Sequence, residues 1–358
     1  MGNSTLNPEW KEGLYNDNLS WEQTDQYDFG LDLDFFNYRL GVVVDYYYRY
    51  TNKMLSKYNL PGLGHISGFA SQWRNAASLS NEGLELLVKY EIFRRSDLYW
   101  KVTVNGARNW NRLRSTTSGQ DLGTKVIGRS INEVKVLKTD GFVDYQDDIP
   151  AYWRADGYKA YISDSGYASI YYKPGDYKFV DINGDGQISS DDVVCVGSAL
   201  PEFYGGLVSE FKWKNFDLNL SMAYQLGRCI INLMPINALT KNQGPLLYDA
   251  RKVTFWSKPG DRADYPYGGN GVTDVAKDVE KVNWLKLKTV TVGYNLPQVW
   301  MKKIGLKQVR FFASGENLLT FTNYSGMDPE TVDIRTGNDG GRNYPLARKF
   351  TLGLTVKF

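Results

Sequence analysis

The sequence predicts an all-β fold of long antiparallel strands, and the main evidence is the alternation of apolar and polar residues. In residues 216–224 every second side chain is apolar, whereas Asp217 and Asn219 fall on the opposite side. This period of two is the pattern of a strand with two different faces. Residues 98–105 and 349–358 repeat it. The pattern therefore predicts strands with one apolar and one polar face.

The second observation is the length of the strand candidates, which exceeds the roughly 5–6 residues of an average strand. Long, evenly alternating strands favour a membrane-spanning barrel. Alternation also describes the sheets of a soluble β-sandwich, so the pattern alone leaves both architectures open. The nine candidates are residues 27–35, 40–50, 83–93, 98–105, 204–213, 216–224, 284–294, 309–319 and 349–358.

Two long stretches between these strands, residues 111–203 and 234–282, are dense in Asp, Gly, Pro, Ser and Tyr and show no regular period. Loops of that length are uncommon in compact domains and are usually functional. Short turns at one end and long loops at the other are typical of outer-membrane barrels, whose long loops are extracellular. No low-complexity linker divides the chain, so one domain over residues 1–358 is expected.

Composition excludes several classes of protein. Lys and Arg number 42 and Asp and Glu 40 in 358 residues, without the basic stripe of a nucleic-acid binder. The mean hydropathy of -0.43 is compatible with a soluble protein and with a membrane barrel. In a barrel strand, alternating apolar and polar residues cancel in the mean. Cys195 and Cys229 have no CxxC spacing, which excludes a zinc ribbon and leaves a single disulfide open. The first residues lack the pattern of a signal peptide, so we expect either that a signal peptide has been removed or that the chain is a fragment with an added start.

Four phrases of the sequence occur in the order in which similar phrases stand in one known protein family. The most specific is SGENLLTFTNYSGMDPE at 314–330, a strand followed by an acidic-Pro-acidic turn. ASLSNEGLEL at 77–86, NWLKLKTVTVGYNLP at 283–297 and the ending YPLARKFTLGLTVKF follow the order of the family. These phrases resemble the SusC/RagA family of TonB-dependent outer-membrane transporters from Bacteroidetes, and the resemblance covers nearly the whole chain.

The resemblance implies an antiparallel transmembrane β-barrel, of which this chain is the C-terminal part, with long extracellular loops. No segment resembles a plug or a TonB-box, and about nine strands cannot close a roughly 22-stranded barrel. The resemblance also implies location in the cell outer membrane, in contact with lipid. It also implies TonB-dependent import of oligosaccharides, or of peptides, together with a SusD-like surface lipoprotein and TonB, and no enzymatic activity.

Residues 181–192, DINGDGQISSDD, have the oxygen spacing of a calcium-binding loop, with Gly186 at the sharp turn. Asp192 stands where such loops usually carry Glu, and Ile188 is expected to anchor the loop on apolar surface. We expect a structural calcium ion, and the alternative is a polar turn without metal. The expected ligands are Asp181, Asn183, Asp185, the Gln187 carbonyl, Ser189 and Asp192.

Aromatic residues of the two long loops have the chemistry of a glycan site, where rings stack on sugars beside hydrogen-bonding groups. Packing at the membrane interface or against a SusD-like partner explains the same residues equally well. The candidate ligand-binding residues are Trp153, Tyr158, Tyr161, Tyr171, Tyr172, Tyr265 and Tyr267.

Two other functions compete with transport. The first is a soluble or surface-anchored, calcium-containing β-sandwich that binds glycans. The second is a calcium-dependent glycoside hydrolase, which needs two carboxylates facing each other across a cleft. The sequence singles out no such pair, and its one histidine, His65, has no nucleophile motif beside it. An enzyme is therefore not expected.

Overall fold

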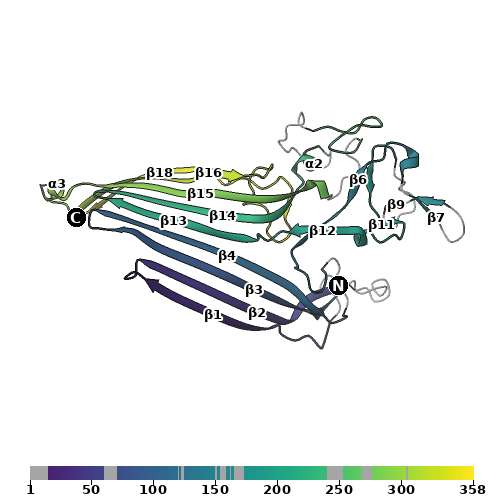
Figure 1. The fold of residues 1–358 in the computed structure, drawn as a ribbon, viewed down its shortest axis with the longest axis horizontal. Coiled ribbons are helices and arrows are strands. Elements are labelled where there is room, and N and C mark those ends of the chain that lie inside the picture. Colours follow the sequence, from purple (N-terminus) through teal and green to yellow (C-terminus); the bar gives the residue numbers. More distant parts are fainter. Residues whose placement is uncertain are drawn as a thin grey trace, which may run out of the picture. The chain divides into compact units, whose positions relative to one another are not determined.

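The computed structural model describes residues 15–59, 71–119, 121, 125–149, 151–153, 159–161, 163–164, 173–239, 253–267, 276–303 and 305–358. Its main element is a sheet in the order β1-β2-β3-β4-β13-β14-β15-β16-β18, in which β17 also pairs with β14 (Figure 1). The strands of this sheet are β1 Gln23–Phe35, β2 Leu40–Asn59, β3 Ser71–Arg94, β4 Leu98–Thr116, β13 Phe203–Trp213, β14 Phe216–Asn232, β15 Val279–Asn295, β16 Gln308–Thr322, β17 Asn338–Asp339 and β18 Lys349–Lys357.

Each of the nine predicted strands lies in one long strand of this sheet, so the all-β prediction is confirmed. Several strands are longer than predicted, and β3 has 24 residues. The prediction ended strands where apolar residues became sparse. Backbone hydrogen bonds continue a strand whether or not its side chains are apolar, so the ends could not be read from hydropathy.

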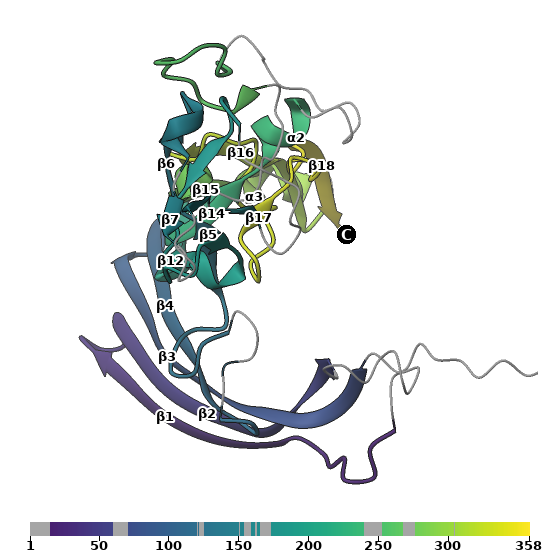
Figure 2. The same cartoon turned by 90° about the vertical axis from the view of Figure 1, so that its right-hand side faces the viewer.

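The chain forms two compact units. The first comprises Met1–Asp32, Val43–Leu86 and Ala107–Ile131. The second comprises Leu33–Val42, Leu87–Gly106 and Asn132–Phe358. Figure 2 shows β1, β2 and β3 side by side, as their order in the sheet requires.

Within the first unit, the strands have two contrasting faces. On β1, Tyr27 and Phe29 are 58% and 67% exposed on one side. On the other side, the Arg49 guanidinium donates to the Gln26 amide oxygen at 3.0 Å and Tyr47 bonds to Asn109 at 3.0 Å. These polar groups line a recess, and the alternating pattern accounts for both faces.

Within the second unit, alternation stays in register from strand to strand. Trp213 pairs with Phe216, Phe216 with Tyr294, Tyr294 with Phe311, and Phe311 with Leu354. Each of Trp213, Phe216 and Phe311 is about half exposed. In the part of the chain that the structure describes, no second sheet packs against this row. We call this side the apolar face and the opposite side the polar face.

The apolar face has the height of a bilayer core. Its paired rows run from Trp213 back to Phe203, mostly with aliphatic and aromatic side chains. At about 3.4 Å per residue these rows cover about 34 Å along the strand. With the strand tilt of about 40° found in membrane barrels, the band is about 26 Å tall, close to the roughly 25 Å of such barrels.

The polar face of the second unit carries charged pairs. The Arg310 guanidinium on β16 reaches Asp217 on β14 at 2.6 Å, across Gly293 of the strand between them. A Cβ atom at Gly293 would lie 2.5 Å from the Asp217 oxygens, so this contact requires glycine. Glu210 and Lys212 line the recess beside it. A polar face of this kind suits a wall that faces water.

Connections at the two ends of the strands differ in length. At one end residues 36–39, 95–97 and 214–215 form tight turns, and residues 296–307 include the short helix α3 Gln298–Lys303. At the other end the connections are longer, such as residues 323–348 between β16 and β18. Figure 1 shows α3 and the helix α2 Met234–Leu239 at opposite ends. None of the helices in the described residues is long and apolar enough to cross a membrane.

The stretch 111–203 is not irregular throughout, contrary to the prediction. It continues β4 to Thr116 and contains small two-stranded sheets. One of them packs Val134 and Val136 on Cys229 and Ile231 of β14, a contact that periodicity cannot reveal. The further elements are β5 Glu133–Leu137, β6 Thr139–Phe142, η2 Gln146–Asp148, β7 Ala151–Trp153, β8 Lys159–Tyr161, β9 Ser163–Asp164, β10 Tyr177–Phe179, β11 Gln187–Ile188, η3 Ser190–Asp192, β12 Val193–Ser198 and η6 Ala276–Asp278.

Candidate functional site: a loop fixed on the polar face

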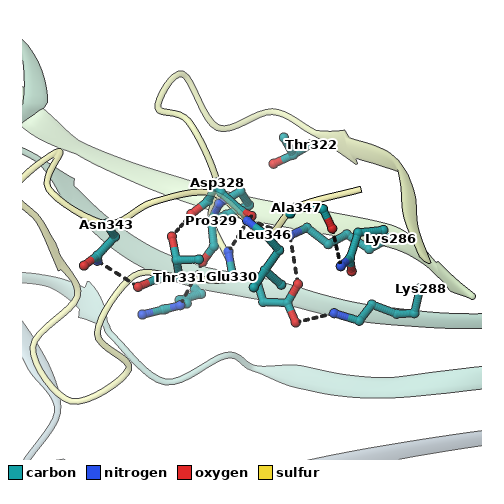
Figure 3. A network of polar contacts seen from close by, with 12 residues as sticks. Lys286, Lys288, Thr322, Asp328, Pro329, Glu330, Thr331, Asn343, Leu346 and Ala347 are labelled. Carbon is teal, nitrogen blue, oxygen red and sulfur yellow. Dashed lines mark hydrogen bonds and ion pairs between the residues drawn. The ribbon is translucent and has the colours of Figure 1, made fainter. Parts of the chain in front are cut away.

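Residues 323–348, which we name the inner loop, lie on the polar face of β15. Lys286 of β15 stands between Leu285 and Leu287, whose partners on the adjacent strands belong to the apolar face. Its side chain is therefore on the polar face. The Lys286 Nζ donates to Asp328 Oδ1 of the inner loop at 2.6 Å (Figure 3). This contact places the loop against the polar face of the sheet.

Glu330 extends the contact to a second lysine. Its carboxylate accepts from Lys286 Nζ at 2.8 Å and from Lys288 Nζ at 2.7 Å (Figure 3). The Lys286 side chain is 3% exposed and that of Asp328 6%. The Lys286–Asp328 pair is thus shielded from water, whereas the Lys288 and Glu330 side chains are 27% and 26% exposed. Such a pair is strongly destabilised when one partner is removed.

The surroundings lower the pKa of both carboxyl groups. Burial alone would raise the pKa of Asp328, but hydrogen bonds from Lys286 and from the backbone N–H groups of Glu330 and Leu346 outweigh it. Burial would also raise the pKa of Glu330. The hydrogen bonds from Lys286 and Lys288 outweigh this effect, so the pKa of Glu330 lies below its usual range. Both groups are therefore anionic at neutral pH.

Arg228 of β14 holds the next part of the inner loop by its backbone. The guanidinium is 2% exposed and donates to the carbonyl oxygens of Pro329 at 3.2 Å, Val332 at 3.0 Å and Asp333 at 2.7 Å. It also donates to the Ala199 carbonyl at 2.9 Å. The planar fork of arginine can serve several acceptors at once, which fixes the course of the chain.

The ends of the inner loop are fixed as well. Tyr324 Oη donates to Asp339 Oδ2 at 2.5 Å, and burial, then this bond, raises the pKa of the Tyr324 phenol. β17 within the loop pairs in parallel with the end of β14. The Tyr324 and Val332 side chains pack with Trp284 in a buried cluster. The loop is thus part of the packed structure.

This site joins two of the phrases that carry the family resemblance. The acidic-Pro-acidic turn of the first phrase, Asp328-Pro329-Glu330, contacts Lys286 and Lys288 of the phrase NWLKLKTVTVGYNLP. Sequence reasoning missed this contact. The available signal was the equal spacing, since two lysines and two carboxylates each lie two residues apart.

The loop 181–192 is closed by its own backbone. Asp181 accepts from the N–H groups of Gly184 at 2.7 Å and Gly186 at 2.9 Å. Asp185 accepts from the Gln187 N–H at 2.7 Å, and Asn183 Oδ1 accepts from the Asp185 N–H at 2.9 Å. These hydrogen bonds close the turn around residues 181–187.

Asp192 is fully buried and its two oxygens accept from Ile182 N at 2.8 Å and Ser189 N at 2.8 Å. Ile188 is 2% exposed in a cluster with Tyr177, so its predicted anchoring role is confirmed. The described residues contain no group of three or more His, Cys, Asp or Glu that could hold a metal ion. Calcium binding stays a prediction.

The seven aromatic candidates fall into three groups. Tyr158, Tyr171 and Tyr172 lie outside the described residues, as does His65. Trp153 ends β7 and Tyr161 ends β8, two strands that pair with each other, and the backbone alone is described there. The remaining two candidates, Tyr265 and Tyr267, have described side chains.

Tyr265 and Tyr267 differ in exposure. The Tyr265 ring is 7% exposed, with the Lys277 ammonium 3.7 Å from its centre and Phe255 against it, so it cannot stack on a sugar. Tyr267 is 56% exposed and meets Trp256 edge-on. A polar recess of about 360 Å³ lies beside Tyr265, lined among others by Asn232. Tyr267 therefore remains a candidate for ligand contact.

The two cysteines are free. Cys195 on β12 is exposed and Cys229 on β14 is buried. The disulfide left open by the sequence is therefore not formed in this structure.

Comparison with known proteins gives relatives over the whole chain. The TonB-dependent receptor P3 of Formosa agariphila is 31% identical over 371 residues, which cover 100% of this chain and 36% of the relative. The TonB-dependent receptor SusC of Bacteroides thetaiotaomicron is 27% identical over 96% of this chain and 33% of its own length. No family model matches the sequence.

Solved structures agree with these relatives. The RagAB peptide transporter matches with a TM-score of 0.72 and 26% identity, over 96% of this chain and 36% of the matched one. Its structure in an open-open state matches with a TM-score of 0.69. The chain spans about a third of the length of the curated relatives it matches.

Proposed function

Since the chain belongs to the SusC/RagA type of TonB-dependent receptors, we propose that it forms part of the wall of a nutrient importer. Receptors of this type are outer-membrane proteins, and the chain is part of one. The proposed activity is energised import of oligosaccharides, or of peptides, and not catalysis.

One observation carries this proposal. The sheet of the second unit has an apolar face with half-exposed rings such as Trp213 and Phe311, and a polar face with ion pairs such as Asp217–Arg310. Lipid supplies the apolar environment that the first face needs, and a water-filled passage suits the second. A wall between the two is what an importer requires.

The inner loop is held in a fixed position on the polar side of this wall. Lys286 and Arg228 attach the loop by charge and by backbone contacts, both away from water. Loops held on a rigid scaffold are where binding residues are usually found. We place ligand contacts on this loop and on the neighbouring segment that carries Tyr267.

Oligosaccharides are the first substrate class in this proposal, with peptides as the other. The recess beside Tyr265 is lined by amide, carboxylate and hydroxyl groups, from Asn232, Glu280 and Ser325. Groups of these kinds hydrogen-bond sugar hydroxyls, and the exposed Tyr267 ring adds a face for stacking. A SusD-like surface lipoprotein and TonB are the proposed partners.

The soluble glycan-binding sandwich does not fit the fold. In a sandwich the apolar faces of two sheets bury each other. Phe350 and Leu352 of β18 are 78% and 86% exposed, and nothing in the described part of the chain covers them. The matched barrel structures have the same fold over 96% of this chain.

Uptake by cells that carry the intact receptor tests this function. Labelled oligosaccharide and peptide pools are compared in cells with the receptor, without it, and with TonB inactivated. We expect uptake of one pool to need both receptor and TonB. Uptake unaffected by losing either would disprove import.

A matched pair of variants assigns the contact to Tyr267. Tyr267→Ala should lower uptake about two- to tenfold, since stacking of rings contributes roughly 0.5–1.5 kcal/mol. Tyr145→Ala, which also removes an exposed tyrosine from a loop, should not. Equal uptake by both variants would remove Tyr267 from the site while leaving import intact.

A further inference from the structure

The connection 296–307 differs from the other described connections at its end of the sheet. Residues 36–39, 95–97 and 214–215 are tight turns, whereas this one contains the helix α3. Its sequence, LPQVWMKKIGLK, carries three lysines and no Asp or Glu. A longer, uniformly basic connection at one place calls for a physical explanation.

α3 covers the margin of the apolar face. On β16, Phe311 is 50% exposed, but Val309, two residues nearer the connection on the same face, is only 7% exposed. Met301 of α3 is 2% exposed, and α3 contacts β16. Burial of two apolar side chains at the edge of an otherwise exposed face places α3 against that face.

The outward side of α3 combines apolar and basic groups. Val299 and Trp300 are 68% and 56% exposed. Lys303 and Lys307 are exposed, and the Lys307 N–H donates to the carbonyl of Lys357, the next strand's exposed lysine, at 2.8 Å. Tryptophan is enriched where hydrocarbon meets head groups, and ammonium groups bind phosphate.

We propose that the surface formed by α3, Lys307 and Lys357, which we name the basic turn, binds anionic phospholipid head groups. Trp300 would enter the boundary of the apolar band while the lysines neutralise phosphates just beyond it. The basic turn lies at the short-connection end, opposite the end of the long loops (Figure 1). The lipids are therefore those of the leaflet at that end.

A lipid fits this surface better than an acidic protein. An acidic protein could pair with the lysines. It would not account for the exposed Trp300 and Val299, which lie beside a face that is in contact with hydrocarbon. A bilayer satisfies both at once, because its head groups and its apolar core meet at this height. The proposal needs only that the chain is membrane-embedded and does not depend on the substrate.

Lipid retention by the intact receptor tests the proposal. The receptor is reconstituted with equimolar phosphatidylglycerol and phosphatidylcholine, and the lipids that it retains are identified and quantified by native mass spectrometry. Lys303→Gln/Lys307→Gln should reduce phosphatidylglycerol affinity roughly tenfold, since each lysine near a charged surface contributes severalfold. Phosphatidylcholine retention should not change. Trp300→Ala should lower retention of both lipids.

The control makes the same charge change elsewhere. Lys173→Gln/Lys258→Gln removes two exposed lysines of the long connections and should leave retention unchanged. Wild-type phosphatidylglycerol affinity in the Lys303/Lys307 variant would overturn the proposal. The proposal would also be overturned if inorganic phosphate displaced phosphatidylglycerol as well as the lipid itself does, because the surface would then be a site for free phosphate. Loss of a cross-linked protein in that variant with lipid retention intact would instead identify a protein docking surface.

Discussion

Two acidic segments of the second unit, the inner loop and residues 181–192, neutralise their carboxylates in different ways. Asp328 and Glu330 of the inner loop are paired with lysines of β15, more than 40 residues away in sequence. Asp181 and Asp185 are paired with backbone N–H groups of their own loop. The first arrangement needs the sheet, and the second needs only its own turn.

The difference predicts how each segment responds to change. Breaking a buried pair leaves a charge without a partner and without water, which costs about 3–5 kcal/mol. Losing one hydrogen bond in a half-exposed turn costs about 0.5–1.5 kcal/mol, because water replaces the partner. Changes to the inner loop should therefore be larger and should depend on residues of the strands.

The largest effect is expected for Lys286→Met in the intact receptor. Methionine fills similar space but leaves Asp328 and Glu330 without the shared cation, so local stability of the inner loop should fall by about 3–5 kcal/mol. Hydrogen exchange of residues 323–348 measures it. Lys281→Met on the same strand is the control, since Lys281 and Glu202 pair at 2.9 Å in the open, 62% and 49% exposed. Equal exchange in both variants would mean that the buried pair does not hold the loop.

A smaller effect is expected for Arg228→Lys. Lysine keeps the charge but cannot reach the carbonyls of Pro329, Val332 and Asp333 with one planar fork. Hydrogen bonds to a charged group contribute about 1.5–3 kcal/mol, so protection of the loop should fall by about that amount. Arg335→Lys, at a side chain that is 82% exposed, should not change exchange. Unaltered exchange after Arg228→Lys would show that charge alone is enough.

Acid should release the inner loop. The pKa values of Asp328 and Glu330 are lowered in the folded protein, so their stabilisation is present above the unfolded pKa and is lost as pH falls through the folded one. Unfolded values are about 3.9 and 4.3. Exchange of residues 323–348, corrected for the intrinsic rate, should stay constant from about pH 7 to 5 and rise below about 4. Asp328→Asn/Glu330→Gln should weaken this dependence, and a dependence centred near neutral pH would contradict it.

Alternation predicts the strands but not what lies on them. Residues 216–224 and 309–319 were assigned to strands because their two faces differ, and they lie in β14 and β16. The partners of Lys286 could not be chosen among 40 acidic residues, since a salt bridge has no local signature. Arg228 was missed because its partners are backbone carbonyls, which every sequence contains. Packing also decides that Tyr265 is buried and Tyr267 is exposed, which the sequence does not indicate.

The smallest effect concerns the loop 181–192, where two explanations of the same spacing remain to be separated. Its oxygens already accept from backbone N–H groups, and this closes the turn as an Asp/Gly-rich segment can do without metal. An ionised carboxylate has about four acceptor positions, so Asp181 and Asp185 retain capacity for a cation. Calcium would add order to a turn that already has some.

In the intact receptor, calcium should therefore slow proteolysis within residues 181–192 only modestly, and Asp181→Ala/Asp185→Ala should abolish that difference while barrel assembly is unchanged. The long strands do not depend on Asp181 and Asp185, since the hydrogen bonds of these two side chains stay within the loop. Asp147→Ala, at an exposed acidic position of the short helix η2, is the control and should keep the calcium effect. Calorimetry with calcium and with a chelator supplies the second measurement. If calcium changes neither heat nor cleavage, the backbone N–H groups alone close the turn, and the spacing reflects turn formation.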